Sequence, residues 1–257
     1  MDEIVCDGNR IATRLARPPS GTRLKRPGST RLPVVVLMPG FPRGTGGAAL
    51  AGNTYPQLAD RVAAQSGWAA LTLHYRGTGP SPGSFTIDGW LADVAAVIDT
   101  LRARSDISGV WLAGFRLGGS LAVVAAARDP EVRGIATFGA PAELHSWVPD
   151  AARFADYCRR VGVLGDGAGL DDADATERWG AAIAELDIEG AAALVNPRPW
   201  MLVHGSHDDV VSIEHARRLA GASKGAAEQR ILEHGAHRLR HDPRAIAMLM
   251  GWLSRQR

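Results

Sequence analysis

Short continuous runs of apolar residues recur along the chain, and most are followed by a segment with helical spacing. Residues 34–38 read Val-Val-Val-Leu-Met, with no polar alternation, which indicates a strand buried on both faces of a parallel sheet. Residues 87–104 instead place apolar side chains three and four positions apart, as on one face of a helix. Strands are predicted at 34–38, 69–75, 110–113, 132–138, 200–204 and 229–232, and helices at 55–65, 87–104, 118–128, 213–220 and 243–253. This alternation predicts an α/β fold in which helices cover both faces of a mostly parallel sheet.

Two regions depart from the alternation. Near the start, residues 4–6 and 11–15 flank Asp-Gly-Asn, which predicts a β-hairpin, and the Pro-, Gly- and Ser-rich residues 17–33 predict a surface loop. Residues 140–196 contain a helical pattern near 151–161, a Gly- and Asp-rich loop at 165–174 and a second helical pattern near 176–186. We interpret this region as a small helical cap inserted into a single domain that spans residues 1–257.

Four loops that follow predicted strands carry the candidate chemistry. They are residues 38–44 (Met-Pro-Gly-Phe-Pro-Arg-Gly), 114–119 (Gly-Phe-Arg-Leu-Gly-Gly), 204–211 (His-Gly-Ser-His-Asp-Asp-Val-Val) and 233–239 (Glu-His-Gly-Ala-His-Arg-Leu). Ligands of an open α/β sheet bind at the carboxyl ends of its strands, so we expect these loops to meet at one edge. In this order the loops resemble those that build the active site of the α/β-hydrolase superfamily, in particular its serine esterases and acyl hydrolases. Residues 74–81 are similar to a further family turn, Arg-Gly-x-Gly-x-Ser.

The resemblance covers the chain from about residue 34 onward, the cap excepted, and implies the α/β-hydrolase fold. It assigns His237 as the catalytic histidine and Asp208 as the acid that orients it, with the adjacent Asp209 as second choice. It also assigns the backbone N–H groups of Phe41 and Leu117 as oxyanion donors.

Arg116 occupies the nucleophile position, where the serine enzymes of the family carry serine. A guanidinium stays protonated and only donates hydrogen bonds, so no acyl-enzyme can form there by the usual route. Ser120 is no substitute, because it lies one helical turn further on and should point away from the pocket. We expect a positive φ at Arg116, which strains a non-glycine residue, and its long side chain could turn outward or pair with Asp208. Pro39 is a second departure, since it stands where the family usually has histidine.

Composition adds few constraints. Hydrophobic residues make up 46% of the 257 residues, charged residues 22%, and the formal net charge is +2, so nothing indicates a nucleic-acid partner. The basic run at 237–241, His-Arg-Leu-Arg-His, is interpreted as a solvent-exposed face. No signal peptide or membrane span is recognised, and Cys6 and Cys158 are expected to be free thiols in a reducing cytoplasm. The abundance of alanine and arginine suggests a GC-rich, bacterial source.

Competing motif interpretations are weaker. The glycines at 114–119 lack the spacing and early position of a dinucleotide-binding turn. His234 and His241 lie near His237 without a carboxylate at ligand spacing, so we interpret both as surface residues and expect no metal or cofactor. The residues Trp90, Trp111, Trp179, Trp200 and Trp252 occupy core-like positions.

Three functions are compatible with this pattern. The first is a degenerate hydrolase of serine-esterase ancestry that binds a small anionic ligand, a carboxylate or phosphate held by Arg116, in the old pocket. The second is an active hydrolase or lyase-like enzyme in which the His237–Asp208 pair acts as general base without a covalent intermediate. The third is a protein-interaction scaffold, with the Asp208–His237 contact kept only for structure. The sequence does not determine the ligand or the oligomeric state.

Overall fold

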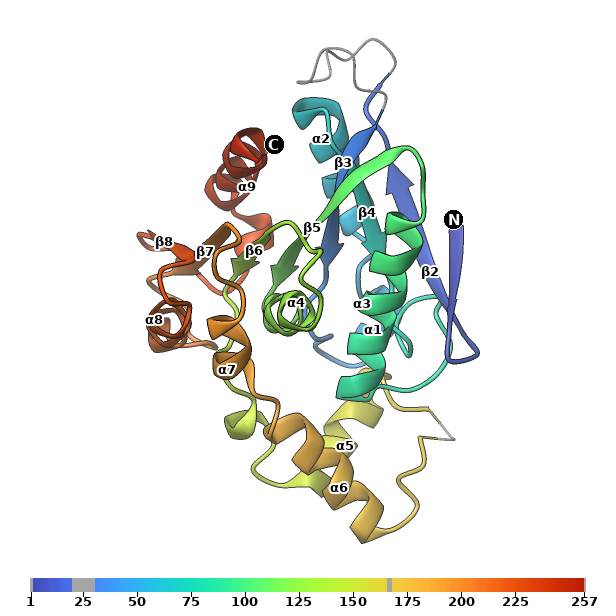
Figure 1. Cartoon of the computed structure of the whole chain (residues 1–257). Helices are drawn as coiled ribbons and strands as arrows, with labels where there is room; N and C mark the ends of the chain where they lie inside the picture. Colours follow the sequence, from blue (N-terminus) through green and yellow to red (C-terminus); the bar gives the residue numbers. More distant parts are fainter. Residues whose placement is uncertain (1, 20–30, 166–167, 257) are drawn as a thin grey trace.

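The described residues form a mixed sheet of eight strands in the order β1-β2-β4-β3-β5-β6-β7-β8 (Figure 1). The computed structural model describes residues 2–19, 31–165 and 168–256. Strand β2 is antiparallel to β1 and β4, and all other neighbours are parallel, as predicted. The strands are β1 (Asp2–Cys6), β2 (Asn9–Ala16), β3 (Leu32–Met38), β4 (Ala69–Leu73), β5 (Ile107–Phe115), β6 (Ile135–Phe138), β7 (Trp200–Gly205) and β8 (Ala227–Leu232).

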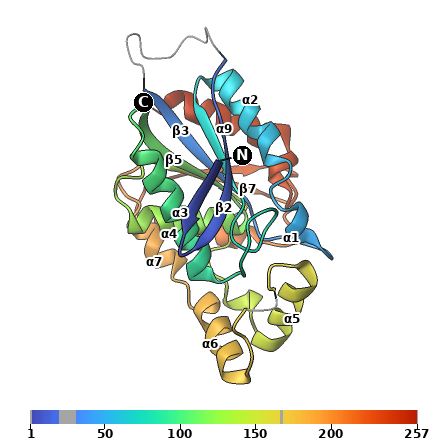
Figure 2. The ribbon, with the colours of Figure 1, turned by 90° about the vertical axis from the view of Figure 1, so that its right-hand side faces the viewer.

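Helices cover both faces of this sheet. Helices α2 and α9 pack together on one face, and α3, α4 and α8 lie on the other, where α7 joins α4 and α8 (Figures 1 and 2). The helices are α1 (Gly47–Leu50), α2 (Tyr55–Ser66), α3 (Ile87–Arg102), α4 (Leu117–Arg128), α5 (Ala151–Val161), α6 (Ala173–Ala184), α7 (Ile188–Ala193), α8 (Ile213–Ala222) and α9 (Pro243–Arg255), with 3-10 turns η1 (His145–Trp147) and η2 (Leu239–His241).

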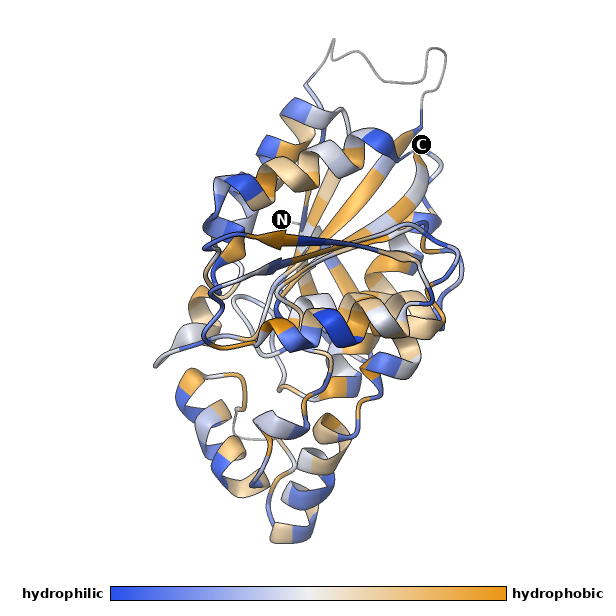
Figure 3. Cartoon of the chain, turned by 90° about the vertical axis from the view of Figure 1, so that its left-hand side faces the viewer, coloured by the Kyte–Doolittle hydropathy of each residue, from blue (hydrophilic) through white to orange (hydrophobic). Residues whose placement is uncertain are grey.

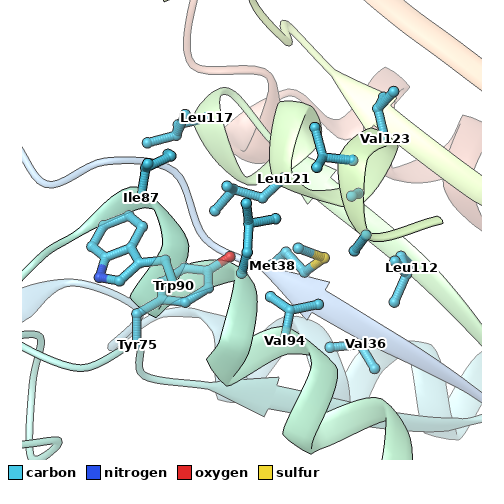
Figure 4. Close-up of a cluster of buried hydrophobic side chains, with 14 of the residues drawn as sticks. Val36, Met38, Tyr75, Ile87, Trp90, Val94, Leu112, Leu117, Leu121 and Val123 are labelled. Carbon is cyan, nitrogen blue, oxygen red and sulfur yellow. The ribbon is translucent and has the colours of Figure 1, made fainter. Parts of the chain in front are cut away.

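The apolar run in β3 is divided between two cores. Val34, Val36 and Met38 face the α3 and α4 side, and Val35 and Leu37 face the α2 and α9 side. The central strands β3 to β7 are accordingly mostly hydrophobic, whereas the edge strand β8 exposes Glu228, Gln229 and Arg230, and the helices carry polar residues outward (Figure 3). Figure 4 shows the first core, where side chains from β3, β5, α3 and α4 interlock. The five tryptophans expected in the core are all buried.

Several predicted boundaries need correction. Strand β6 begins at Ile135 rather than 132, because residues after Asp129 form a turn in which the Glu131 N–H bonds the Asp129 carboxylate. Strand β3 begins at Leu32, inside the stretch predicted as loop, and residues 20–30 of that loop lie outside the described residues. Helix α6 begins at Ala173 because the carboxylate of Asp172 accepts the Ala175 N–H and caps it.

Helices α5 and α6 pack against each other and project from the sheet at its carboxyl edge (Figure 2). Helix α7, within the range predicted for the cap, was missed by the sequence analysis, because it is short and rich in alanine. It packs against α4 and α8 and so belongs to the layer beside the sheet. The assignment of residues 140–196 as one cap insertion stays a prediction.

Candidate active site

Arg116 sits at the tip of a sharp turn between β5 and α4. Its φ is 55° and its ψ is −125°, so the positive φ expected from the sequence is present. The turn is held because the Arg116 N–H donates to the Phe138 carbonyl on β6, at 2.7 Å. The flanking glycines are required by close packing: a Cβ on Gly114 would lie 2.1 Å from the Gly118 carbonyl oxygen, and one on Gly118 would lie 2.4 Å from that of Met38.

The Arg116 side chain turns toward the loop that follows β3. Its Nη2 donates to the Phe41 carbonyl at 3.2 Å, and no carboxylate of the described residues forms an ion pair with it. Pairing with Asp208, considered from the sequence, does not occur. Burial lowers the pKa of Arg116; Tyr55 opposes this effect, and Arg43 adds to it. The guanidinium still remains charged, so the centre of the site is an uncompensated cation.

His237 and Asp208 meet beside Arg116. The Nδ1–H of His237 donates to the Asp208 carboxylate, with oxygen distances of 2.9 and 3.0 Å. The N–H groups of Val210 and Val211 also donate to Asp208, at 3.0 and 2.9 Å. Burial acts to raise the pKa of Asp208, but the hydrogen bonds from His237, Val211 and Val210 outweigh it and leave that pKa lowered. Asp208 is therefore ionised at neutral pH, and its contact with Nδ1 fixes the orientation of the His237 ring.

Asp209, the second choice for the acid, is exposed and does not contact His237. His204, which was not singled out from the sequence, is fully buried behind the turn that carries Asp208. Its Nε2 donates to the Val211 carbonyl at 2.8 Å and lies 3.8 Å from an oxygen of Asp208. Burial lowers the pKa of His204 and favours the neutral ring, so this residue helps to hold the turn that positions Asp208.

The two proposed oxyanion donors flank the same turn. The structure records no hydrogen bond from the N–H of Phe41 or Leu117 to any of the described residues. Phe41 is held by its ring, whose centroid lies 5.1 Å from that of Phe85 and 5.6 Å from that of Trp90. Ser120, by contrast, is buried and donates to the Pro141 carbonyl at 2.7 Å, away from the pocket as expected.

A cleft with two lobes opens around Arg116. Arg43, Arg116 and His237 line both lobes. The aromatic lobe, of about 410 Å³, is completed by Phe41, Trp147, Phe154, Tyr157 and Val210. The cationic lobe, of about 540 Å³, lies toward α2 and the loop after β8, and its charged or hydroxyl-bearing lining beyond the shared residues is Thr45, Thr54, Tyr55, Arg238, Arg240 and His241.

The basic run at 237–241 therefore needs a partial correction. Arg238 and His241 are exposed as predicted, but both line the cleft, and Arg240 is only partly exposed. The guanidinium carbon of Arg240 stacks 5.1 Å from the centroid of the Tyr55 ring. The run begins at His237, the residue predicted as the catalytic histidine, and lies in the loop after β8, so the fold brings it to the edge where the other loops converge. His234 is exposed, as expected.

Within the part of the chain that the structure describes, no group of three or more His, Cys, Asp or Glu side chains is placed to hold a metal ion. None of the described helices is both long and apolar enough to cross a membrane. Cys6 and Cys158 are free and buried.

Comparison with known proteins identifies the fold. The family described as "alpha/beta hydrolase fold" matches residues 33–160. The solved structure of Est1E from Butyrivibrio proteoclasticus with bound ferulic acid is similar over 99% of this chain and 96% of that one, at 17% identity and a TM-score of 0.70. The esterase domain of a Rhodothermus marinus protein is similar over 98% and 95% of the two chains, at 20% identity and a TM-score of 0.65. The chain therefore has the α/β-hydrolase fold.

In sequence, the chain is 27% identical over 169 residues to the uncharacterized protein YfhR of Escherichia coli O157:H7. That match covers 63% of this chain and 51% of YfhR, so it spans about half the length of the relative.

Proposed function

We propose that this protein binds a small anionic ligand in the cleft around Arg116 and does not turn over esters through an acyl-enzyme. The observation that supports this proposal is the state of the Arg116 guanidinium in the turn between β5 and α4, called the elbow below. It donates to the Phe41 carbonyl and forms no ion pair with a carboxylate of the described residues. A charge held in this way gains a strong partner when a carboxylate or phosphate enters. The resemblance to serine esterases supports an origin among hydrolases.

The surroundings of Arg116 support a small molecule as the ligand. The aromatic lobe has a volume in the range of small-molecule sites and is lined by Trp147, Phe154 and Tyr157. Est1E, which shares the fold, has been solved with ferulic acid, an aromatic carboxylic acid. We therefore take an aromatic carboxylate as the first ligand to test.

A scaffold role receives less support. The large apolar side chains that are exposed in the described residues are scattered over the surface, and none lies on α5 or α6; they are Val5, Leu50, Leu194, Val210 and Ile231. An interaction surface on the cap would need a contiguous apolar patch there.

The decisive experiment measures benzoate binding by calorimetry together with labelling by a fluorophosphonate. The wild-type protein should bind benzoate and should not be labelled, because no hydroxyl stands at the elbow. The Arg116→Met variant should lose most of the benzoate affinity while keeping a long side chain at the turn. Stoichiometric labelling within the cleft, or benzoate binding that survives Arg116→Met, would contradict the proposal.

A general-base enzyme is the second candidate, favoured by the 2.9 Å contact between His237 Nδ1 and Asp208. That contact orients the imidazole as in enzymes that use histidine to take a proton. If the pair acts as a general base, the wild-type protein should convert a substrate, and the His237→Ala variant should not. Turnover that persists in His237→Ala would exclude the pair as the base.

A further inference from the structure

Arginines that line the cleft differ from most arginines elsewhere in the protein. Arg43, Arg116, Arg238 and Arg240 form no ion pair with any carboxylate of the described residues. Many arginines outside the cleft do face an acid, for example Arg76 with Asp93 at 2.7 Å. Four of the chain's 29 Lys and Arg residues thus gather in one place, and the remainder are outnumbered by its 27 Asp and Glu residues.

No acidic side chain lines either lobe in the described part of the chain, so the positive charge of the cleft is not neutralised from within. Two of the four cations, Arg116 and Arg240, are only partly exposed to water, and this burial lowers the pKa of both. Arg43, Arg238 and Arg240, which line the same lobe as Arg116, lower the pKa of Arg116 further. Several like charges held close together, without an acid, favour an incoming anion of more than one charge.

Two neutral features point in the same direction. Thr54 and Tyr55, at the N-terminus of the 12-residue helix α2, line the cationic lobe. Because these residues begin the helix, the positive end of its dipole lies at the wall of this lobe, and the Thr54 side chain forms no capping hydrogen bond there. The buried Tyr55 hydroxyl lies close enough to Arg116 and Arg240 for both to lower its pKa, although burial raises that pKa to about 12 overall. Tyr55 therefore stays protonated and cannot compensate the arginines.

The aromatic lobe shares three lining residues with the cationic lobe, namely Arg43, Arg116 and His237. Its ring-bearing wall comes from the cap, where Phe154 and Tyr157 stack with centroids 6.2 Å apart, and from Phe41, 5.9 Å from Phe154. Because the two lobes share these residues, one ligand could place a planar apolar group in the aromatic lobe and an anionic group in the cationic lobe.

We propose that the ligand is an aromatic phosphomonoester, whose ring lies in the aromatic lobe and whose phosphate lies in the cationic lobe against Arg43, Arg238 and Arg240. This inference rests on the proposed anion-binding function and specifies its ligand class. Arginine suits it because the planar guanidinium matches the geometry of phosphate oxygens and donates two parallel hydrogen bonds. A monocarboxylate would need only Arg116, which leaves the other three cations unexplained.

The test uses calorimetric titration with three probes: phenyl phosphate, inorganic phosphate and benzoate. Phenyl phosphate should bind at least tenfold more tightly than either of the others, and its affinity should fall as salt increases. The double variant Arg43→Gln/Arg238→Gln should weaken both phosphate probes by at least tenfold, since both side chains are exposed at the rim and form no side-chain hydrogen bond that the fold needs. The variant Phe154→Ala should weaken phenyl phosphate and leave inorganic phosphate unchanged.

The matched control is Arg178→Gln, which removes the same kind of charge from an exposed site on α6 that lines neither lobe. Phenyl phosphate affinity that is the same in the double variant and in this control would overturn the phosphate assignment. If benzoate still bound in an Arg116-dependent way, the proposed anion-binding function would stand while the phosphomonoester inference fell. If none of the three probes bound to the wild-type protein, both would fail together. Equal melting temperatures of the variants would show that the fold is not the cause.

Discussion

The backbone strain at Arg116 leads to a quantitative prediction. A φ of 55° with a ψ of −125° is a conformation that glycine adopts readily and other residues do not. Holding a non-glycine residue there costs about 1–3 kcal/mol. Glycine would recover this strain but lose about 0.5–1 kcal/mol through the greater freedom of the unfolded chain. Arg116→Gly should therefore be more stable than Arg116→Ala by about 1 kcal/mol, with an upper limit of about 2.5 kcal/mol.

Comparing glycine with alanine isolates the strain, because both substitutions remove the guanidinium and its bond to Phe41. In a domain of this size the difference corresponds to a melting temperature higher by about 2–4 °C per kcal/mol for the glycine variant. Differential scanning calorimetry and urea unfolding would measure it. The pair Lys224→Gly and Lys224→Ala serves as control, since Lys224 has a φ of 51° in an exposed turn. An alanine variant as stable as the glycine variant would refute the reasoning and show that the turn relaxes.

Three further predictions follow from the site and the core. Arg116→Ser should restore slow hydrolysis of short acyl esters, at a rate at least about tenfold above that of Arg116→Ser/His237→Ala. The reason is that nucleophile and base together raise the rate by several orders of magnitude in intact enzymes. Equal rates in the two variants would mean that the site has decayed beyond its nucleophile. Because the pKa of Asp208 is lowered in the folded protein, its contribution to stability should be present above the unfolded value, near pH 4, and be lost as the pH falls through the folded pKa. Asp208→Asn should flatten this acid dependence in urea unfolding, and an unchanged slope would count against the linkage. Asp93→Asn should lower the free energy of unfolding by about 3–5 kcal/mol, because it leaves Arg76, whose side chain is 11% exposed, without its buried partner. As the control, Asp60→Asn removes the exposed Arg14–Asp60 pair and should lower the free energy of unfolding by less than about 1 kcal/mol.

The central elements of the fold could be predicted from local pattern because each has a strong local cause. The unbroken apolar run of residues 34–38 predicts a strand with two buried faces, and it forms the central part of β3. The Asp-Gly turn after Cys6 has positive φ at both residues, at 48° and 76°, which is what a tight hairpin needs. The short helix α7 could not be predicted from local pattern. It is only six residues long, and its packing against α4 and α8 stabilises it.

The candidate site divides in a similar way. The sequence by itself was enough to predict that Arg116 stands at the family's nucleophile position, with Asp208 and His237 after it in family order, because each of these residues follows the end of a predicted strand. Only the tertiary structure decided where the arginine side chain points, that it has a carbonyl and no acid beside it, and that Arg43, Arg238 and Arg240 surround it. Arg43 and Arg240 are almost two hundred residues apart in the chain and share a cleft only because parallel strands deliver their carboxyl-end loops to one edge of the sheet. For the same reason, the basic run at 237–241 looks like ordinary surface in the sequence, and only the fold shows that it lines the cationic lobe.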